Sequence, residues 1–347
     1  MKVPLPPRRV RRLVIDPVFW LVGVLLLLIT LPVLVVVSVL VVVLPGPLRG
    51  LRLVGFALVF LAVELVVLPV ALCSWVASGF GWAIRRPGFV EFHYLLARAL
   101  LAVVYWFGSR FFALELDRRG PEQPERDPQA FVSPLLVLSR HAGPGDSLLL
   151  VHELLSWAGR RPRVVLKDTL QWDPMIDVLL NRLPMAFVDA ASADQGGVIE
   201  GIGQLAASMG PRDALLIFPE GGNVTPKRRK KAIERLHSSG RESAAARAEG
   251  IVHLMPPRPR GVQAALQANP ALRVIVVAHT GLDDLNTIGD LWESIPVDKT
   301  LYLRWHAISA SEVPSDEQGL SDWLFTEWEQ MDAWVSAHRE DPVGDAA

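Results

Sequence analysis

Cysteine is almost absent from this 347-residue chain, since Cys73 is the only one and lies within an apolar run. A single thiol excludes an internal disulfide framework and a zinc site built from cysteines. Strong net charge is also lacking, because 35 lysines and arginines oppose 36 aspartates and glutamates. A net charge of −1 does not favour a nucleic-acid binder, whose domain is typically basic, and we expect no nucleic-acid partner. No internal repeat is visible.

Charged residues are scarce in the first quarter of the chain, whereas the remainder has the mixture of a soluble domain. The chain is 51% hydrophobic with a mean hydropathy of +0.31, which is high for a soluble protein of this size. Part of the chain is therefore expected to lie in lipid. The charged residues between Arg12 and Arg85 are Asp16, Arg49, Arg52 and Glu64.

Two long apolar segments predict a transmembrane helical hairpin. Residues 17–48 carry no charge and, as a helix, would extend roughly 48 Å, against a hydrocarbon core of about 30 Å. Residues 53–84 carry one charge, Glu64, and the Pro-Gly-Pro sequence at 45–47 signals a turn between the segments. A carboxylate facing lipid is costly, so we expect Glu64 to face the partner helix or an interface.

Basic residues flank this hairpin and predict its orientation. Four arginines lie within residues 8–12 and two more at 85–86, while the connecting turn has only Arg49 and Arg52. The positive-inside rule then places both ends in the cytoplasm and predicts an inner-membrane protein with a cytoplasmic soluble domain. A secretory signal peptide is the alternative, but the apolar run is too long and lacks a small-residue cleavage site.

Two further segments complete the predicted domain organisation. Residues 89–112 are apolar and aromatic but interrupted by charges, which favours an interfacial amphipathic helix over a third span. The polar, proline-rich sequence at 120–128 indicates a boundary. We therefore expect a transmembrane hairpin over 1–88, an interfacial helix and linker over 89–128, and a cytosolic domain over 129–347.

The sequence of residues 129–347 predicts an α/β domain. Its expected helices at 147–158 and 198–208 alternate with short apolar runs, which favours a mixed, largely parallel sheet flanked by helices. Leucines and tryptophans near helical spacing over 320–338 predict a C-terminal helix packed on the domain. The expected strands are 135–138, 163–166, 185–188, 214–218 and 274–278.

The stretch from Ser139 to Ser147 contains the first candidate for chemistry. His141 follows a predicted strand, a Gly-Pro-Gly turn comes next, and Asp146 opens a predicted helix. Across such a turn the carboxylate can accept from one imidazole nitrogen, fix the tautomer and leave the other nitrogen as a base. The alternative is that Asp146 or Ser147 merely caps the helix and His141 is incidental.

A second stretch, Phe218-Pro219-Glu220-Gly221, ends another predicted strand with glycine, which allows backbone N–H groups to approach a ligand. With His141-x4-Asp146 it resembles the glycerolipid acyltransferase superfamily, especially the membrane-bound 1-acylglycerol-3-phosphate acyltransferases. Two more blocks agree over about residues 132–282. They are Lys167 with Pro174 and Phe187-Val188-Asp189, and Pro257-Arg258-Pro259-Arg260-Gly261 with the strand at 274–278.

This resemblance implies transfer of an acyl group from acyl-CoA or acyl-carrier protein to the free hydroxyl of a lysophospholipid. The expected acceptor is 1-acylglycerol-3-phosphate, giving phosphatidic acid, with His141 as general base and Asp146 orienting it. Neither a metal nor a bound cofactor is implied. The residues that the resemblance assigns to substrate binding are Lys167, Phe218, Pro219, Glu220, Gly221 and Arg258.

Two departures from the family pattern leave an alternative open. Ala190 stands where the family usually has arginine, and Gly222 where it usually has threonine. They favour a catalytically silent lipid-binding or scaffold protein on a decayed acyltransferase fold. Arg258, Arg260 or the basic cluster at 227–231 is expected to compensate. That cluster either binds headgroups or coenzyme A phosphates or is a solvated face. A serine hydrolase is disfavoured because no G-x-S-x-G sequence is present.

Overall fold

The computed structural model describes residues 5–43, 48–120, 132–189, 195–283, 288–309 and 312–339. The chain divides into two compact units. The first comprises Met1–Leu114, Val165–Asp194 and Trp292–Asp298. The second comprises Glu115–Val164, Gln195–Leu291 and Lys299–Ala347. The first unit thus includes two segments that the sequence assigned to the cytosolic domain.

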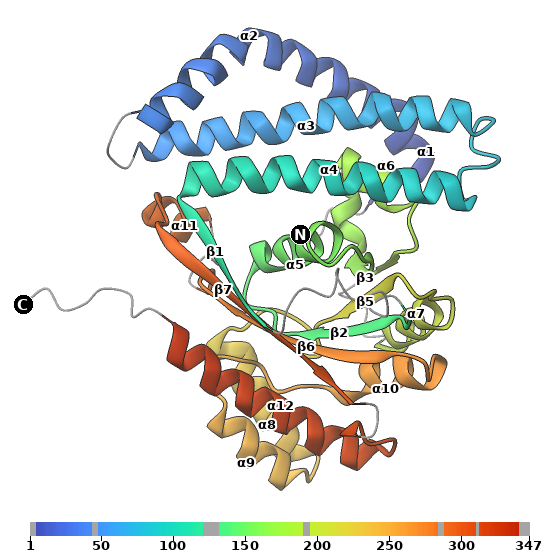
Figure 1. The fold of residues 1–347 in the computed structure, drawn as a ribbon, viewed down its shortest axis with the longest axis vertical. Coiled ribbons are helices and arrows are strands. Elements are labelled where there is room, and N and C mark those ends of the chain that lie inside the picture. The colour runs from blue at the N-terminus through green and yellow to red at the C-terminus, as the bar shows by residue number, and fades with distance from the viewer. Residues whose placement is uncertain are drawn as a thin grey trace, which may run out of the picture. The chain divides into compact units, whose positions relative to one another are not determined.

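Three long helices dominate the first unit and lie side by side (Figure 1). Antiparallel packing of the first pair is fixed by Trp20, whose indole N–H donates to the Leu65 carbonyl at 3.0 Å, and by contact between Val37 and Val59. Proline at position 32 accounts for the visible curvature of the first long helix. The helices are α1 (Arg8–Val10), continued by η1 (Arg11–Ile15) and α2 (Asp16–Val43), then α3 (Arg49–Ala77) and α4 (Pro87–Phe112).

All three helices are long and apolar enough to cross a membrane, over Arg8–Val33, Arg49–Ala77 and Pro87–Phe112. Their burial differs, because 6% of the most apolar window in the first is buried against 44% in the second. The first helix therefore leaves most of its apolar surface uncovered by protein, whereas nearly half of the α3 window is buried. The two predicted long helices are present, and α4 has a span's length as well, so its interfacial position stays a prediction.

Polar contacts hold the segment Val165–Asp194 against these helices within the first unit. Arg182 donates to the Ala71 carbonyl at 2.7 Å and to the Ser74 hydroxyl at 2.8 Å, and lies 3.0 Å from Nε2 of His93. Arg11 pairs with the fully buried Asp177 at 2.7 Å. These side chains explain why the segment belongs with the apolar helices. Its elements are η3 (Asp168–Trp172), α6 (Pro174–Leu180) and β4 (Ala186–Val188).

Glu64 is buried, but its hydrogen-bond partner is not on the preceding helix, where the sequence predicted one. It is 5% exposed and hydrogen-bonds Asp173, which also caps α6 by accepting from the Ile176 amide at 2.8 Å. Two carboxyl groups share a hydrogen bond only when one of them carries the proton. The partner thus comes from a segment distant in sequence rather than from the preceding helix.

A mixed sheet forms the core of the second unit, in the order β1-β7-β6-β2-β5-β3. Neighbours β6-β2-β5-β3 are parallel, while β7 is antiparallel to β6. In the first unit the last residues of β3, 165–167, pair with β4, also in parallel. The predicted α/β fold with a largely parallel sheet is confirmed. The strands are β1 (Leu114–Arg119), β2 (Leu135–Ser139), β3 (Arg161–Lys167), β5 (Asp213–Ile217), β6 (Arg273–Thr280) and β7 (Lys299–Ile308).

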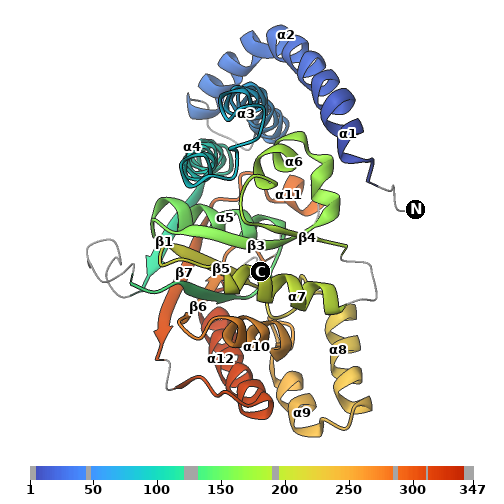
Figure 2. The same ribbon diagram turned by 90° about the vertical axis from the view of Figure 1, so that its right-hand side faces the viewer.

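Helices cover both faces of this sheet. In Figure 2, α5 (Pro144–Ser156) lies on one face, with α7 (Gln195–Ala207), α10 (Pro259–Ala268) and α12 (Glu317–His338) on the other. The predicted C-terminal helix packed on the domain is confirmed, because Leu320, Leu324 and Trp328 of α12 are at most 1% exposed. The remaining helices are α8 (Pro226–Ser238), α9 (Glu242–Gly250) and α11 (Ile288–Ser294).

Candidate active site

The two predicted motifs meet at one edge of the sheet. Strand β2 lies between β5 and β6, and all three run in the same direction. The loops that leave their carboxyl ends are therefore neighbours, which is where ligands bind in open α/β sheets. His141 lies in the loop after β2, and Phe218 begins the loop after β5.

His141 and Asp146 face each other across the turn that begins α5. Nδ1 of His141 lies 3.2 Å from Oδ1 and 3.1 Å from Oδ2 of Asp146. The carboxylate is fixed from the other side, since Oδ2 accepts from the amides of Ala142 at 2.6 Å and Gly143 at 3.1 Å. Asp146 therefore caps the helix and also binds the imidazole. The motif can thus serve as a helix cap and as a His/Asp pair, which the sequence analysis treated as alternatives.

The surroundings of Asp146 keep its carboxylate ionised, and this determines which nitrogen of His141 carries a proton. Asp146 has no exposed side-chain surface, and burial raises its pKa. The hydrogen bond from His141, the nearby His279 and the Gly143 amide outweigh burial, so the net pKa of Asp146 is lowered and the carboxylate is ionised. An ionised acceptor requires a proton on Nδ1 of His141, so in the neutral imidazole the lone pair lies on Nε2.

Nε2 of His141 is the nitrogen available to a substrate. The side chain is 19% exposed, and its ring stacks on Phe218 with centroids 4.6 Å apart. No partner is found for Nε2 among the residues that the structure describes, whereas Nδ1 is bound to Asp146. A packed ring with one free nitrogen has the arrangement of a general base.

Glu220 supports the histidine from inside the protein. It is 1% exposed; Oε2 accepts from the His141 amide at 2.9 Å and Oε1 accepts from the Trp328 indole at 3.2 Å. Burial, opposed by Arg140, raises its pKa to about 7. Both oxygens are thus bound to protein groups, which positions His141, and the predicted contact of Glu220 with substrate stays a prediction.

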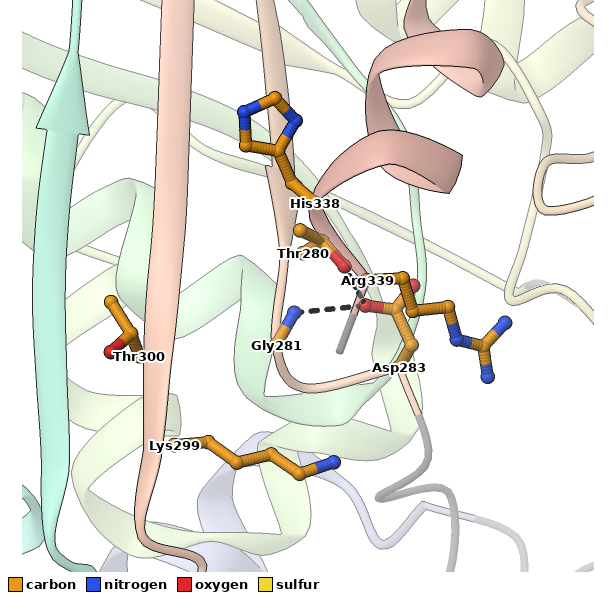
Figure 3. A pocket seen from close by; sticks show the side chains of 7 residues that line it. All are labelled: Thr280, Gly281, Asp283, Lys299, Thr300, His338 and Arg339. Carbon is orange, nitrogen blue, oxygen red and sulfur yellow. Dashed lines mark hydrogen bonds between the residues drawn. The ribbon is translucent and has the colours of Figure 1, made fainter. Parts of the chain in front are cut away.

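Arg140 directly precedes His141 in the loop after β2, and the sequence analysis did not single it out. Arg140 is 2% exposed, donates to the His279 carbonyl at 2.9 Å and pairs with Asp283. Figure 3 shows Asp283 accepting from Thr280 and the Gly281 amide, at 2.7 and 3.0 Å, in a hollow at the end of β6. These contacts join the loops after β2 and β6 and hold the backbone next to His141.

The segment that contains these features matches a family model described as Acyltransferase, over residues 119–280. This part of the chain belongs to the acyltransferase family. Among solved structures, the chain is similar to the 1-acyl-sn-glycerophosphate (LPA) acyltransferase PlsC from Thermotoga maritima. The identity is 14% and the TM-score 0.46, over 79% of this chain and 98% of that one. The search of curated proteins gave no match.

Most of the predicted binding residues of this acyltransferase lie in the loop after β5. Pro219 accepts from the Arg258 amide at 2.9 Å, and the Gly221 amide donates to Phe218 at 3.1 Å. Gly221 has φ of +71°, a left-handed conformation that favours glycine, and the guanidinium of Arg258 lies over it. The loop after β5 thus brings Arg258 close to the predicted motif.

Lys167 is exposed at the end of β3 and belongs to the first unit, so its role in substrate binding stays a prediction. Ala190, one of the two departures from the family pattern, lies outside the described residues. The other departure, Gly222, is described, has φ of +145° and lies under the Arg228 guanidinium.

Proposed function

We propose that this acyltransferase moves a fatty acyl group from acyl-CoA or acyl-carrier protein to the hydroxyl of a lysophospholipid. The proposed acceptor is 1-acylglycerol-3-phosphate, and the product is phosphatidic acid. The observation that supports this function best is the His141 imidazole, held by the buried Asp146 with Nε2 unoccupied. We place the site at the cytoplasmic face of the inner membrane, in keeping with the positive-inside prediction and the apolar helices.

The proposed reaction is a direct transfer. Nε2 of His141 takes the hydroxyl proton while the acceptor oxygen attacks the thioester carbonyl carbon. The new C–O bond forms, the C–S bond breaks, and the leaving sulfur takes the proton back from the imidazolium. The ionised Asp146 stabilises the imidazolium in between. No acyl-enzyme forms, and the step needs neither a resident metal nor a bound cofactor.

Replacing the histidine tests the proposal. His141→Ala removes the base and is expected to lower kcat by roughly 10²–10⁴-fold, the usual contribution of positioned proton transfer. The assay follows phosphatidic acid formation by the full chain in membranes, with acyl-CoA and 1-acylglycerol-3-phosphate as substrates.

His237→Ala is the matched control, because that imidazole is exposed on α8 and bonds only Glu242 and Glu249 among described residues. Full activity of His141→Ala would refute the mechanism. Wild-type protein that retains lysophospholipid on purification without turnover would favour the silent lipid-binding alternative.

A further inference from the structure

Helix α12 is connected to the His141 loop by two buried side chains. The helix begins at Glu317, beyond the segment that belongs to the acyltransferase family. Trp328 and Asp332 are four residues apart, about one helical turn, and so lie on the same face of the helix. Both side chains are buried in the second unit, and each is hydrogen-bonded to a group that contacts residues 140–141.

The first connection passes through Glu220. The Trp328 indole N–H donates to Oε1 at 3.2 Å, and Oε2 of the same side chain accepts from the His141 amide at 2.9 Å. Trp328 has no exposed surface and Glu220 is buried, so bulk water does not compete for either hydrogen bond. The indole donor therefore fixes the orientation of the carboxyl group that holds the backbone of His141.

The second connection passes through the loop that follows α9. Asp332 accepts from the amides of Val252 and His253, at 3.0 and 2.6 Å. The His253 carbonyl in turn accepts from the Arg140 guanidinium at 3.3 Å. Helix α12 thus holds His141 through its amide and the preceding residue through its side chain.

We propose that Trp328 is a positioning residue for the acyl transfer proposed above, on which this inference rests. It acts through Glu220 on the His141 amide and touches neither substrate nor the reacting atoms. The backbone that it holds determines where Nε2 of His141 lies relative to the acceptor hydroxyl. A displacement of about 1 Å at such a group can lower a rate by roughly a hundredfold.

Removal of the indole donor tests this role. Trp328→Phe keeps an aromatic ring but has no N–H, and it is expected to lower kcat about tenfold. KM for acyl-CoA and for 1-acylglycerol-3-phosphate is expected to stay within about twofold of wild type, because the base moves and no substrate-binding group is lost. The assay follows phosphatidic acid formation by the full chain in membranes.

An isosteric replacement separates the hydrogen bond from the packing of the ring. Incorporation of β-(3-benzothienyl)alanine at position 328 keeps the size and shape of tryptophan and replaces the N–H by sulfur. Because volume-conserving changes are tolerated in cores, this protein is expected to fold as wild type does and to lose kcat about tenfold. Wild-type kcat in this protein would overturn the inference.

Trp334→Phe is the matched control for lost volume. Trp334 is buried on the same helix, and its ring stacks on His338 with centroids 4.5 Å apart. The same atoms are removed, so a general effect of a cavity in α12 appears in both variants. The control is expected to keep kcat within about twofold of wild type.

A Glu220→Met background shows whether Trp328 acts through the carboxyl group. Methionine approximates the length of glutamate but is only a weak hydrogen-bond acceptor. Two changes that remove the same interaction are not additive, so Trp328→Phe is expected to lower kcat by less than about twofold further in this background. A further tenfold loss would overturn the connection through Glu220.

Hydrogen exchange tests the same connection without acyl transfer. The His141 amide donates to Glu220, so its exchange is slow only while the carboxyl group is held in place. Trp328→Phe is expected to speed exchange about tenfold in a peptide covering residues 139–147, measured by mass spectrometry on the full chain in detergent. Trp334→Phe is expected to leave that peptide unchanged.

Failure of this inference and failure of the proposed function give different results. Equal kcat in Trp328→Phe and Trp334→Phe overturns the positioning role whatever the exchange shows, and transfer by the wild-type chain then leaves the proposed function standing. Faster exchange that is specific to Trp328→Phe, in a chain that transfers no acyl group, supports the connection to the His141 loop and refutes the proposed function.

Discussion

At the residue scale, the arrangement around His141 shows how one buried carboxylate does several things. Asp146 accepts from two backbone amides and from the imidazole, so the helix start and the base are fixed by the same group. Glu220 does the same for the backbone on the opposite side of His141. The Asp146 charge persists although it is buried, because donors surround the carboxylate, whereas burial raises the pKa of Glu220 to about 7.

The Arg140–Asp283 pair gives a prediction for the pH dependence of stability. Burial raises the Asp283 pKa, but the Arg140 charge and its hydrogen bonds outweigh it and lower the pKa to about 2. A depressed carboxyl pKa stabilises the fold above the unfolded value, about 4, and this stability is lost as the pH falls through about 2. The shift corresponds to roughly 2 kcal/mol.

Asp283→Asn is therefore expected to lower the free energy of unfolding by about 2–4 kcal/mol at pH 7, since it also leaves Arg140 buried and unpaired. Denaturant titrations of both proteins at pH 7 and pH 3 measure the difference. The difference is expected to shrink by about half at pH 3. A constant difference across this range would show that the pair does not act through the Asp283 charge.

At the scale of elements, the first unit shows how buried polar contacts attach the segment Val165–Asp194 to the apolar helices. Arg182 follows α6 and places its guanidinium against α3 and α4, where burial lowers its pKa to about 10. It meets carbonyl, hydroxyl and imidazole acceptors instead of a carboxylate. Such a contact fixes the position of α6, because one guanidinium binds acceptors on both α3 and α4.

Arg182→Ala is accordingly expected to destabilise the first unit by about 2–4 kcal/mol, by creating a cavity and removing buried hydrogen bonds from a charged donor. Thermal unfolding of the full chain in detergent, followed together with protease cleavage within 165–194, measures this loss. Arg182→Lys, which reaches fewer acceptors, is expected to lose less. Unchanged cleavage and midpoint in Arg182→Ala would show that the segment is held by other contacts.

At the scale of the whole molecule, the predicted orientation has a direct test. In a Cys73→Ser background, Ala337→Cys places one thiol on an exposed position of α12. A membrane-impermeant maleimide is expected to label it in inside-out vesicles but not in intact cells, because the positive-inside rule places this part in the cytoplasm. Labelling in intact cells would reverse the predicted orientation.

Much of this molecule was predictable because local patterns carry the information. Apolar length predicted the long helices, and alternation of short apolar runs with helices predicted the parallel strands. Strands β1 and β7 were missed, since β7 mixes charged and aromatic residues and pairs antiparallel at distant positions. The buried Arg140–Asp283 pair was not predicted either, because its two members lie in loops that are far apart in sequence.

The residue types available for chemistry, the strand ends that carry them, the His141–Asp146 contact and the apolar helices all follow from local sequence patterns. Which groups from distant segments meet depends on the folded structure. It placed His141 beside Glu220, Asp283 beside Arg140, and two polar segments with the apolar helices. The physical reason is that spacing along a chain fixes neighbours within one turn or strand, whereas contacts between loops depend on strand order and on the burial of charges far apart in sequence.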